Sequence, residues 1–179
     1  TLLRQRGVRM VGPDEGSMAC GEFGPGRLSQ PDVMRDAIVA ALTPDQSLAG
    51  LHAPVTAGPT VEPLDPVRFI SNHSSGKQGY AIAEALAALG ARVTLVTGPV
   101  SIPAPDGVAC VKVQTAEEML TACEAALPAD IAVCTAAVSD WRASVPSGSK
   151  IKKTGDGPPT LTLVENPDIL ATLCHHARR

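Results

Sequence analysis

Residues 51–98 read LHAPVTAGPTVEPLDPVRFISNHSSGKQGYAIAEALAALGARVTLVTG. A strand-like run ending in VTAGPT leads through a loop into the alanine-rich helix QGYAIAEALAALG and then into the β-branched run RVTLVTG. A strand, a helix and a second strand within about 45 residues predict a βαβ unit. Gly90 suits the position just past the end of the helix.

A second strand–helix–strand pattern follows the first. VACVKV predicts a strand, Thr115 and Glu118 fit a capping box at the start of a helix, and DIAVCTAAV predicts a further apolar strand. Asn166 and Pro167 are expected as the N-cap and first-turn residues of a last helix. Apolar strands that alternate with helices indicate an α/β fold, a Rossmann-like doubly wound parallel sheet. Pro54 removes a ladder donor, so we expect it at a strand start or a bulge.

The first part of the chain has a different composition. Residues 12–27, GPDEGSMACGEFGPGR, are rich in glycine and polar residues, which predicts a mobile surface loop or flap. Pro31 fits the first turn of a short helix that ends near Leu42, with Asp32 at its positive end. We therefore expect residues 1–45 to form a flap and helix, and residues 46–179 to form the α/β domain.

Composition restricts the class of protein. The net charge of −3 argues against a nucleic-acid partner, and because only 2% of the residues of the chain are aromatic, the core must be built from Ala, Val, Leu and Ile. Five cysteines without a C-x-x-C spacing indicate a reducing compartment, and no apolar run is long enough to span a membrane. The sequence predicts a cytoplasmic protein.

The loop before the first helix is the candidate phosphate site. Ligands of open parallel sheets bind outside the carboxyl ends of the strands. There SNHSSGKQG offers hydroxyls, a glycine, a lysine and a helix N-terminus. The candidate phosphate-binding residues are Gly58, Ser74, Ser75, Gly76 and Lys77. The alternative is a solvated loop rich in turn formers, and the segment matches neither G-x-G-x-x-G nor a P-loop.

Other polar residues have both a functional and a structural interpretation. Asn72 could hold a carboxylate or acyl phosphate, or simply form a turn, and His73 is either an acid–base group or an exposed loop residue. Asp140 could bind ribose hydroxyls or a metal ion, or cap a helix. The basic run at residues 150–153 could hold a triphosphate or form a solvated face. Cys20 is either a reactive thiol or an incidental loop cysteine.

Several of these segments together resemble a known family. AGPTVEPLDPVRFISNHSSGKQG, AAVSDWRA, KIKK and ENPDIL are similar to the phosphopantothenoylcysteine synthetase half of the bifunctional coenzyme A biosynthesis flavoproteins. The resemblance implies Mg²⁺-dependent ligation of 4′-phosphopantothenate to cysteine with CTP, through an acyl-cytidylate intermediate. It also implies a homodimer formed through this domain.

The resemblance also implies roles for individual residues. Asn72 corresponds to a residue that contacts the acyl-cytidylate, while Asp140 and Lys150 correspond to nucleotide-binding positions. The backbone at residues 134–136 is expected to line the same nucleotide, through Cys134, Thr135 and Ala136. The resemblance leaves the metal ligands open.

The segment SMACGEFGPGRL resembles the flap of the FMN-dependent phosphopantothenoylcysteine decarboxylase that precedes the synthetase in these flavoproteins. It implies that Cys20 is a proton donor, with the FMN site outside this chain. The chain also departs from the family, because it stops at Arg179 and has Ser139 and Trp141 beside Asp140. Two other interpretations stay open: an NADP-dependent oxidoreductase, and a non-catalytic nucleotide-binding or dimerisation module.

Overall fold

A computed structural model describes residues 2–18, 21–43, 45–153, 157 and 159–178. The chain divides into two compact units, Thr1–Asp45 and Gln46–Arg179, each described separately below. No helix within the described ranges is long and apolar enough to cross a membrane.

The N-terminal unit contains the helix α1 (Leu2–Gln5), the strands β1 (Asp14–Ser17) and β2 (Phe23–Arg27), and the helix α2 (Pro31–Leu42). Residues 12–27 were expected to form a mobile surface loop or flap, and within them β1 and β2 pair as an antiparallel hairpin. Backbone hydrogen bonds stabilise its turn, where the Met18 N–H donates to the Glu22 carbonyl at 2.8 Å. The predicted helix at Pro31 is confirmed. Cys20 lies outside the described residues.

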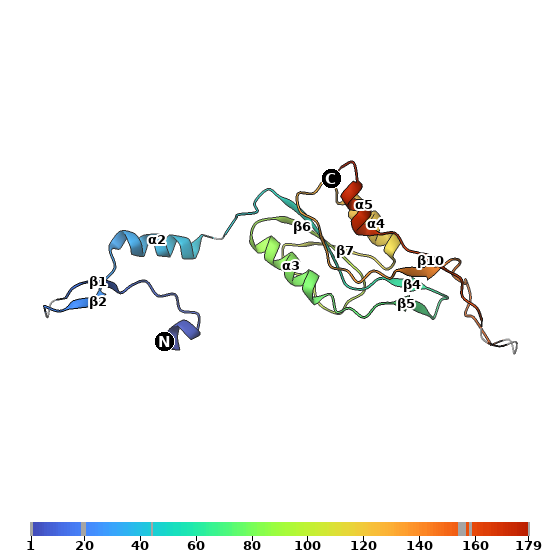
Figure 1. Ribbon diagram of the computed structural model, residues 1–179, viewed down its shortest axis with the longest axis horizontal. Helices are drawn as coiled ribbons and strands as arrows, with labels where there is room; N and C mark the ends of the chain where they lie inside the picture. Colours follow the sequence, from blue (N-terminus) through green and yellow to red (C-terminus); the bar gives the residue numbers. More distant parts are fainter. Residues whose placement is uncertain (1, 19–20, 44, 154–156, 158, 179) are drawn as a thin grey trace. The chain divides into compact units, whose positions relative to one another are not determined.

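A four-stranded parallel sheet forms the centre of the C-terminal unit (Figure 1). Its strands are β3 (His52–Ala57), β6 (Arg92–Thr97), β7 (Ala109–Lys112) and β8 (Val133–Cys134), in the spatial order β7-β6-β3-β8. The chain therefore builds outward from β3 to β7 and then crosses back to place β8 on the other side of β3. This arrangement confirms the predicted Rossmann-like fold and creates a switch point between β3 and β8.

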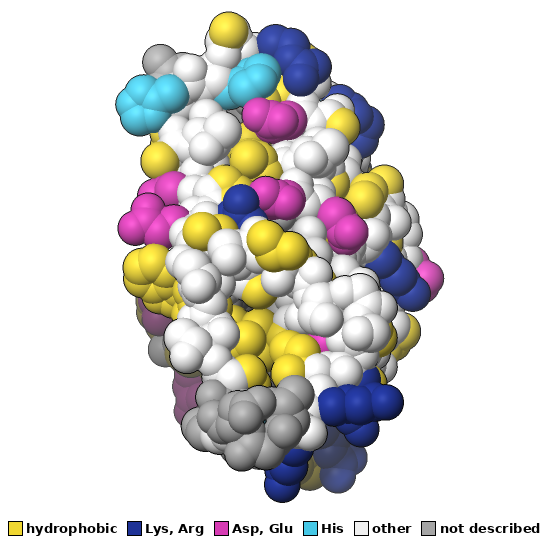
Figure 2. Space-filling view, turned by 90° about the vertical axis from the view of Figure 1, so that its right-hand side faces the viewer, with side chains coloured by type: hydrophobic (Ala, Val, Ile, Leu, Met, Phe, Trp, Pro, Cys, Tyr) yellow, Lys and Arg dark blue, Asp and Glu magenta, His cyan; other side chains and the backbone are white. Residues whose placement is uncertain are grey.

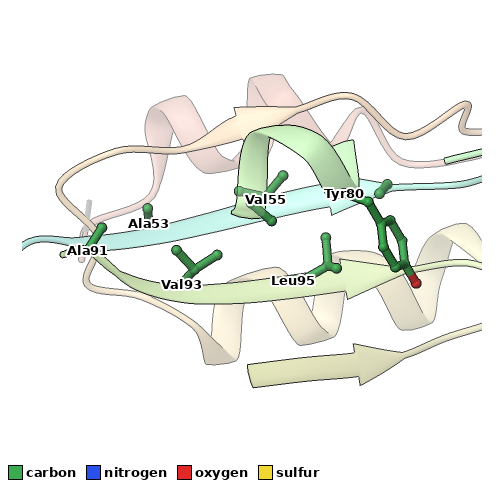
Figure 3. Packing of buried hydrophobic residues seen from close by; sticks show 8 residues of the cluster. Ala53, Val55, Tyr80, Ala91, Val93 and Leu95 are labelled. Atoms are coloured by element: carbon green, nitrogen blue, oxygen red, sulfur yellow. The ribbon is translucent and has the colours of Figure 1, made fainter. Parts of the chain in front are cut away.

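Helices cover both faces of the sheet. The helix α3 (Lys77–Ala88) packs on β3 and β6, while α4 (Ala116–Ala125) packs on the opposite face together with α5 (Ile169–His175). Figure 3 shows the α3 side, where small and branched side chains of the two central strands form one layer and Tyr80 lies at its end, near Leu95. Alanine contributes much of this layer, and Tyr80 is the aromatic residue among its buried members, so the helix lies close to the sheet.

Pro54 was expected at a strand start or bulge, and this was wrong, because it lies in the middle of β3. The backbone carbonyls of His52 and Thr56 accept hydrogen bonds from the β8 side. Since alternate residues face the same side, the Pro54 nitrogen faces that side too. Strand β8 pairs only with Val55 and Thr56 of β3, so the position where Pro54 lacks an N–H is not part of the hydrogen-bond ladder between β3 and β8.

The ends of two helices test the capping predictions. Thr115 and Glu118 form the predicted capping box of α4. The prediction for the last helix was wrong in register, because α5 begins at Ile169 and Asp168 is its N-cap. The Asp168 carboxylate accepts a hydrogen bond from the Ala171 N–H at 2.9 Å. Asn166 is therefore not needed as a cap.

Two short antiparallel ribbons complete the unit. Strand β4 (Val61–Pro63) pairs with β5 (Phe69–Ser71), and β9 (Trp141–Ala143) pairs with β10 (Leu163–Glu165). We call the described residues between β9 and β10, 144–153, 157 and 159–162, the arm; in Figure 1 its coloured part extends away from the sheet beyond β10. Neither ribbon was predicted, because each lies inside a stretch that reads as loop.

Candidate functional site at the switch point

A cleft of about 490 Å³ lies where β3 and β8 end. Thr56 and the segment from Cys134 to Trp141 form one wall, and residues 165–170 form the other. The position is the crevice at the carboxyl ends of parallel strands, where ligands of this fold class bind. The cleft is the largest concentration of predicted site residues in the described chain, since Cys134, Ala136 and Asp140 all line it.

Hydrogen bonds beyond the strand ends fix the floor of the cleft. The Thr56 hydroxyl accepts from the N–H groups of Thr135 and Ala136, at 3.1 and 3.2 Å. Farther along, the Ala137 N–H donates to the Gly58 carbonyl at 2.8 Å. The strand predicted from DIAVCTAAV therefore pairs with β3 as a regular strand over a short stretch only. Beyond it, the hydrogen bonds of Thr135, Ala136 and Ala137 continue the contact with the β3 segment.

The turn that carries Asp140 is held by Asn166. The Asn166 side-chain amide donates to the Ser139 carbonyl at 2.7 Å, and the Asn166 backbone N–H donates to the Asp140 carbonyl at 2.9 Å. Ser139 is buried, and its N–H donates to the Thr60 hydroxyl. The Asp140 side chain is exposed to the cleft, where a carboxylate can accept hydrogen bonds from a ligand or bind a cation.

Asn72 reaches the same wall from the loop before α3. Its side-chain amide donates to the Val138 carbonyl at 2.9 Å, and the neighbouring Ser71 hydroxyl donates to the Thr60 carbonyl at 2.7 Å. Asn72 and Asp140 are therefore attached to the same short segment, although they are far apart in the sequence. The predicted convergence of these two loops is present in the structure.

Behind this wall, glycines in separate segments allow one segment to lie close to the backbone of another. Gly58 and Gly76 both have a positive φ, and a Cβ on Gly76 would lie 3.4 Å from the Gly58 nitrogen. A Cβ on Gly79 would lie 2.5 Å from the Ala57 Cβ, so α3 packs tightly on β3. A linear glycine fingerprint cannot describe this arrangement, because residues 59–75 separate the first two glycines.

None of the five predicted phosphate-binding residues lines the cleft. The Ser74 and Ser75 hydroxyls accept hydrogen bonds from the Gly76 and Lys77 N–H groups, at 3.3 and 3.5 Å, so both are engaged at the start of α3. Lys77 lines a separate cavity of about 520 Å³ with Tyr80. A phosphate role for these residues stays a prediction.

Lys150 also lies apart from the cleft. With Arg68, Lys152 and Lys153 it lines a cavity of about 730 Å³ between the arm and the β4–β5 turn. Asp65 holds this region together: its carboxylate accepts from the Val67 and Arg68 N–H groups, both at 2.8 Å, and from the Ile151 N–H at 3.1 Å. Arg68 adds an ion pair at 3.3 Å.

The environment of Asp65 lowers the pKa of its carboxyl. Burial alone raises this pKa, but the hydrogen bonds from the Val67, Ile151 and Arg68 backbones and the Arg68 charge outweigh that effect. Because the folded pKa lies below the ordinary 3.8, ionised Asp65 stabilises the fold above pH 3.8. This contribution is lost as the pH falls through the lowered pKa.

Asp65→Asn is therefore expected to be less stable than the natural chain near neutral pH, with a gap that narrows below pH 3.8. Urea unfolding from about pH 6 to about pH 2 measures this gap. Asp106→Asn, at an exposed carboxyl, is the control and should show a small, nearly constant difference. A gap for Asp65→Asn that widens in acid would contradict the assignment.

The cleft cysteine is a neutral group. Burial raises the pKa of the Cys134 thiol, and the charges of Cys174 and Asp168 raise it further, whereas a hydrogen bond with the Thr56 side chain acts against this. Burial likewise raises the pKa of Cys123 to about 12. Neither thiol is poised as a thiolate nucleophile at neutral pH, so Cys134 serves as part of the wall.

Two carboxylates of the cleft are of the kind that bind a divalent cation. Asp140 and Glu165 both line it, and Mg²⁺ commonly uses one or two carboxylates together with the phosphates of a substrate. Among the described residues, no three His, Cys, Asp or Glu side chains cluster as a metal site of their own. The donor set therefore fits an ion that arrives with a phosphate-bearing ligand.

Sequence interpretation missed part of this site. Thr56, Ser139, Asn166 and Glu165 all belong to it, yet each reads locally as an ordinary strand or turn residue. Asn166 was singled out only as a helix cap. The role of Asn166 could have been inferred because it is a polar residue directly after a short strand, at a place where the fold brings a second cleft segment close.

The fold and the cleft define the class of this protein: a Rossmann-like α/β protein with a polar ligand cleft at the switch point of its sheet. The chain belongs to the family of DNA/pantothenate metabolism flavoprotein C-terminal domains, whose family model matches residues 48–179.

Curated relatives and solved structures agree with this membership. The chain is 51% identical over 173 residues to the coenzyme A biosynthesis bifunctional protein CoaBC of Escherichia coli K12, covering 95% of this chain and 43% of the relative. It is 46% identical over 176 residues to the protein of the same name from Haemophilus influenzae, covering 98% and 44%. The chain thus spans less than half the length of these relatives.

Two solved structures are similar in fold. The C-terminal domain of a coenzyme A biosynthesis bifunctional protein CoaBC has a TM-score of 0.62 and 41% identity, over 72% of this chain and 60% of that one. The DNA/pantothenate metabolism flavoprotein from Streptococcus pneumoniae has a TM-score of 0.59 and 26% identity, over 69% and 64%.

Proposed function

We propose that this chain acts in coenzyme A biosynthesis, as the domain that joins 4′-phosphopantothenate to cysteine at the expense of CTP. The observation that carries the proposal is the convergence of Asn72 and Asp140 on one segment at the switch-point cleft. The names of the relatives support the pathway. Ligation, the nucleotide and the residue roles are inferences from the motifs.

The reaction would proceed in two steps. A carboxylate oxygen of phosphopantothenate attacks the α-phosphorus of CTP, which forms the acyl-cytidylate and releases pyrophosphate. The amine of cysteine then attacks the acyl carbon, loses a proton and expels CMP. Both steps need alignment of the reacting groups and neutralisation of phosphate charge more than they need a nucleophile from the protein.

The cleft residues fit these needs. Asp140 lines the cleft, where its carboxylate would bond the ribose or hold Mg²⁺ with Glu165, and the bound ion would offset the charge of the phosphates. Asn72 lies beside the wall where the acyl-nucleotide would form and can hold it without titrating. Lys150 would meet the triphosphate only if the phosphates extend toward the arm or the arm moves toward the cleft.

Calorimetry with CTP and Mg²⁺ on the 179-residue chain tests nucleotide binding, with ATP as the comparison. Release of CMP and pyrophosphate in the presence of phosphopantothenate and cysteine tests turnover. Binding without CMP release would favour the non-catalytic nucleotide-binding alternative, which the separation of Lys77 and Lys150 from the cleft supports. Failure to bind CTP would reject the proposal.

Asn72→Asp is expected to reduce formation of the ligated product by about a hundredfold. The new carboxylate cannot donate to the Val138 carbonyl and repels the phosphate of the acyl-cytidylate. Product formation and acyl-cytidylate accumulation are measured in the same quenched reactions.

His73→Ala is the matched control, because His73 is the exposed neighbour of Asn72 in the same loop. It should retain product formation within about threefold, since an exposed loop side chain without a catalytic role contributes little. Unchanged ligation by Asn72→Asp would refute the role of Asn72, and loss of activity in His73→Ala would favour the acid–base interpretation.

A nicotinamide dinucleotide is a poorer candidate for the cleft region. In dinucleotide-binding folds, the pyrophosphate approaches the glycines of the first β–α turn. Here a Cβ added at either Gly58 or Gly76 would lie 2.9 Å from the Val100 Cγ1. The Val100 side chain therefore occupies the space through which a pyrophosphate would approach these glycines.

The N-terminal unit would serve a decarboxylase in a longer protein, with Cys20 as the proton donor. Among the described residues of Thr1–Asp45, only Gly16 and Ser29 are buried. This unit alone does not provide walls for a flavin ring, so it does not fit FMN by itself. Decarboxylation by a longer protein carrying Cys20→Ala, compared with its parent, tests the role of Cys20.

Self-association through the C-terminal unit is also proposed. Exposed apolar side chains gather on the two ribbons and the arm, and Figure 2 shows hydrophobic groups on the face that is the right-hand side of Figure 1. These residues include Phe69, Trp141, Val145, Leu161 and Leu163. Exposed apolar patches of this kind mark interfaces. Sedimentation should give a dimer mass, and a monomer at all concentrations would contradict it.

A further inference from the structure

Arg142 links the strand after the Asp140 turn, the Glu165–Asn166 segment and the start of α4. It lies in β9 directly after the turn that carries Asp140, and its side chain is 31% exposed. One guanidinium nitrogen, Nη1, donates to the Glu165 carbonyl and to the Asn166 side-chain oxygen. The other, Nη2, forms an ion pair with Glu117 in the first turn of α4, at 2.9 Å.

The bond from Arg142 fixes how Asn166 is oriented. The Asn166 side-chain oxygen accepts from Arg142 at 3.3 Å, so its amide nitrogen is the group that donates to the Ser139 carbonyl at 2.7 Å. The Asn166 backbone N–H donates to the next carbonyl, that of Asp140. Asn166 thus holds both carbonyls of the turn from which the Asp140 side chain extends.

The guanidinium offers several N–H donors in a fixed plane, and here they serve a carbonyl and an amide oxygen on the Glu165–Asn166 segment and a carboxylate on α4. Without Arg142 the Asn166 side-chain oxygen would lose this partner, and the orientation of the amide would rest on its bond to the Ser139 carbonyl. The amide, and with it the turn, would then be less firmly positioned.

We propose that Arg142 is a positioning residue that acts through Asn166 to set the Ser139–Asp140 turn and thereby the place of the Asp140 carboxylate. The inference rests on the proposed nucleotide site, because it assigns Asp140 to ligand binding. It is separate from the ion pair with Glu117, which is largely exposed and contributes little by itself.

The test measures CTP–Mg²⁺ affinity of the 179-residue chain by calorimetry for Arg142→Ala, Asn166→Ala and the double variant. Arg142→Ala should raise the Kd about tenfold, and the double variant should bind no more weakly than Asn166→Ala alone. Multiplying effects in the double variant, or an unchanged Kd in Arg142→Ala, would overturn the inference.

Two further variants separate position from charge. Glu117→Gln removes the ion pair alone and should change the Kd by less than about twofold. Arg142→Lys keeps the positive charge but not the planar fork, so its Kd should stay within about threefold of that of Arg142→Ala. Full recovery by lysine would show that charge, and not positioning, is what matters.

Amide hydrogen exchange of the Asn166 N–H provides a readout without ligand. Arg142→Ala should speed this exchange at least about tenfold, whereas Glu117→Gln should leave it nearly unchanged. If the natural chain bound no CTP, the proposed function would fail while exchange still decided the positioning role. An unchanged exchange rate in Arg142→Ala would reject that role whatever the nucleotide result.

Discussion

Replacing Glu62 with alanine is expected to lower the free energy of unfolding of the C-terminal unit by about 3 kcal/mol. Glu62 is 1% exposed, and its carboxylate accepts a hydrogen bond from the Ala116 N–H at 2.9 Å. Ala116 is the first residue of α4, so this buried carboxylate satisfies a helix N-terminus that water cannot reach. The variant would leave that N–H unpaired and open a cavity beside it.

Thermal unfolding should show a decrease in Tm of about 9 °C for this variant, at about 3 °C per kcal/mol for a unit of this size. Glu118→Ala is the matched control on the same helix, because Glu118 is exposed and belongs to the capping box. It should cost about 1 kcal/mol. Equal losses in the two variants would contradict the special role of the buried carboxylate.

The core of the fold could be predicted from sequence because its signals are local. The run RVTLVTG is β-branched and became β6, and the Thr115–Glu118 spacing became the capping box of α4. Each pattern constrains the backbone of its own segment, through χ1 stiffness in one case and side-chain capping of N–H groups in the other. Tertiary contacts were not needed to identify either element.

The misplaced features depend on partners elsewhere in the chain. Pro54 is tolerated in a central strand only because β8 begins to pair beyond it, and nothing near Pro54 in the sequence shows where β8 begins. Asn166 looked like a cap because Asn-Pro is a common helix start. The structure instead uses Asp168 as the cap and commits Asn166 to the Ser139 carbonyl.

The location of the candidate site could be predicted from the sequence, but the arrangement of its side chains could not. Parallel strands put the residues after β3 and β8 at one edge, so Asn72 and Asp140 were expected near each other. The position of Lys150 depends on how Asp65 holds the arm through the Ile151 N–H, a contact 86 residues apart in the sequence. Glu62 reads in the sequence as a loop carboxylate, but in the structure it is buried and accepts a hydrogen bond from the first N–H of α4. No local sequence pattern indicates this role.

Among the described glycines, Gly98 is the one whose replacement by alanine is expected to have the largest effect. An ideal Cβ at Gly98 would lie 1.6 Å from the Pro59 carbonyl oxygen, a backbone atom that no rotamer change can move. The segment at residues 58–60 or the end of β6 must shift. Forcing a methyl group into packed backbone costs more than ordinary overpacking, so we expect a loss of about 4 kcal/mol or more.

The shift should also reach the cleft. Pro59 precedes Thr60, whose hydroxyl accepts the hydrogen bond from the buried Ser139 N–H, and Ser139 begins the turn that carries Asp140. Gly98→Ala should therefore weaken CTP binding even where the variant is still folded. Urea unfolding measures the stability, and calorimetry at a temperature well below the lowered Tm measures the affinity.

Gly148→Ala provides the control for Gly98→Ala. Gly148 lies on the arm, a Cβ there would meet nothing within 4 Å, and its φ is not positive. That variant should match the natural chain within about 0.5 kcal/mol, because it adds neither a clash nor backbone strain. If Gly98→Ala were equally well tolerated, the close approach between the end of β6 and Pro59 could not be what fixes the Thr60–Ser139 contact. The position of Asp140 would then have to depend on Asn166 alone.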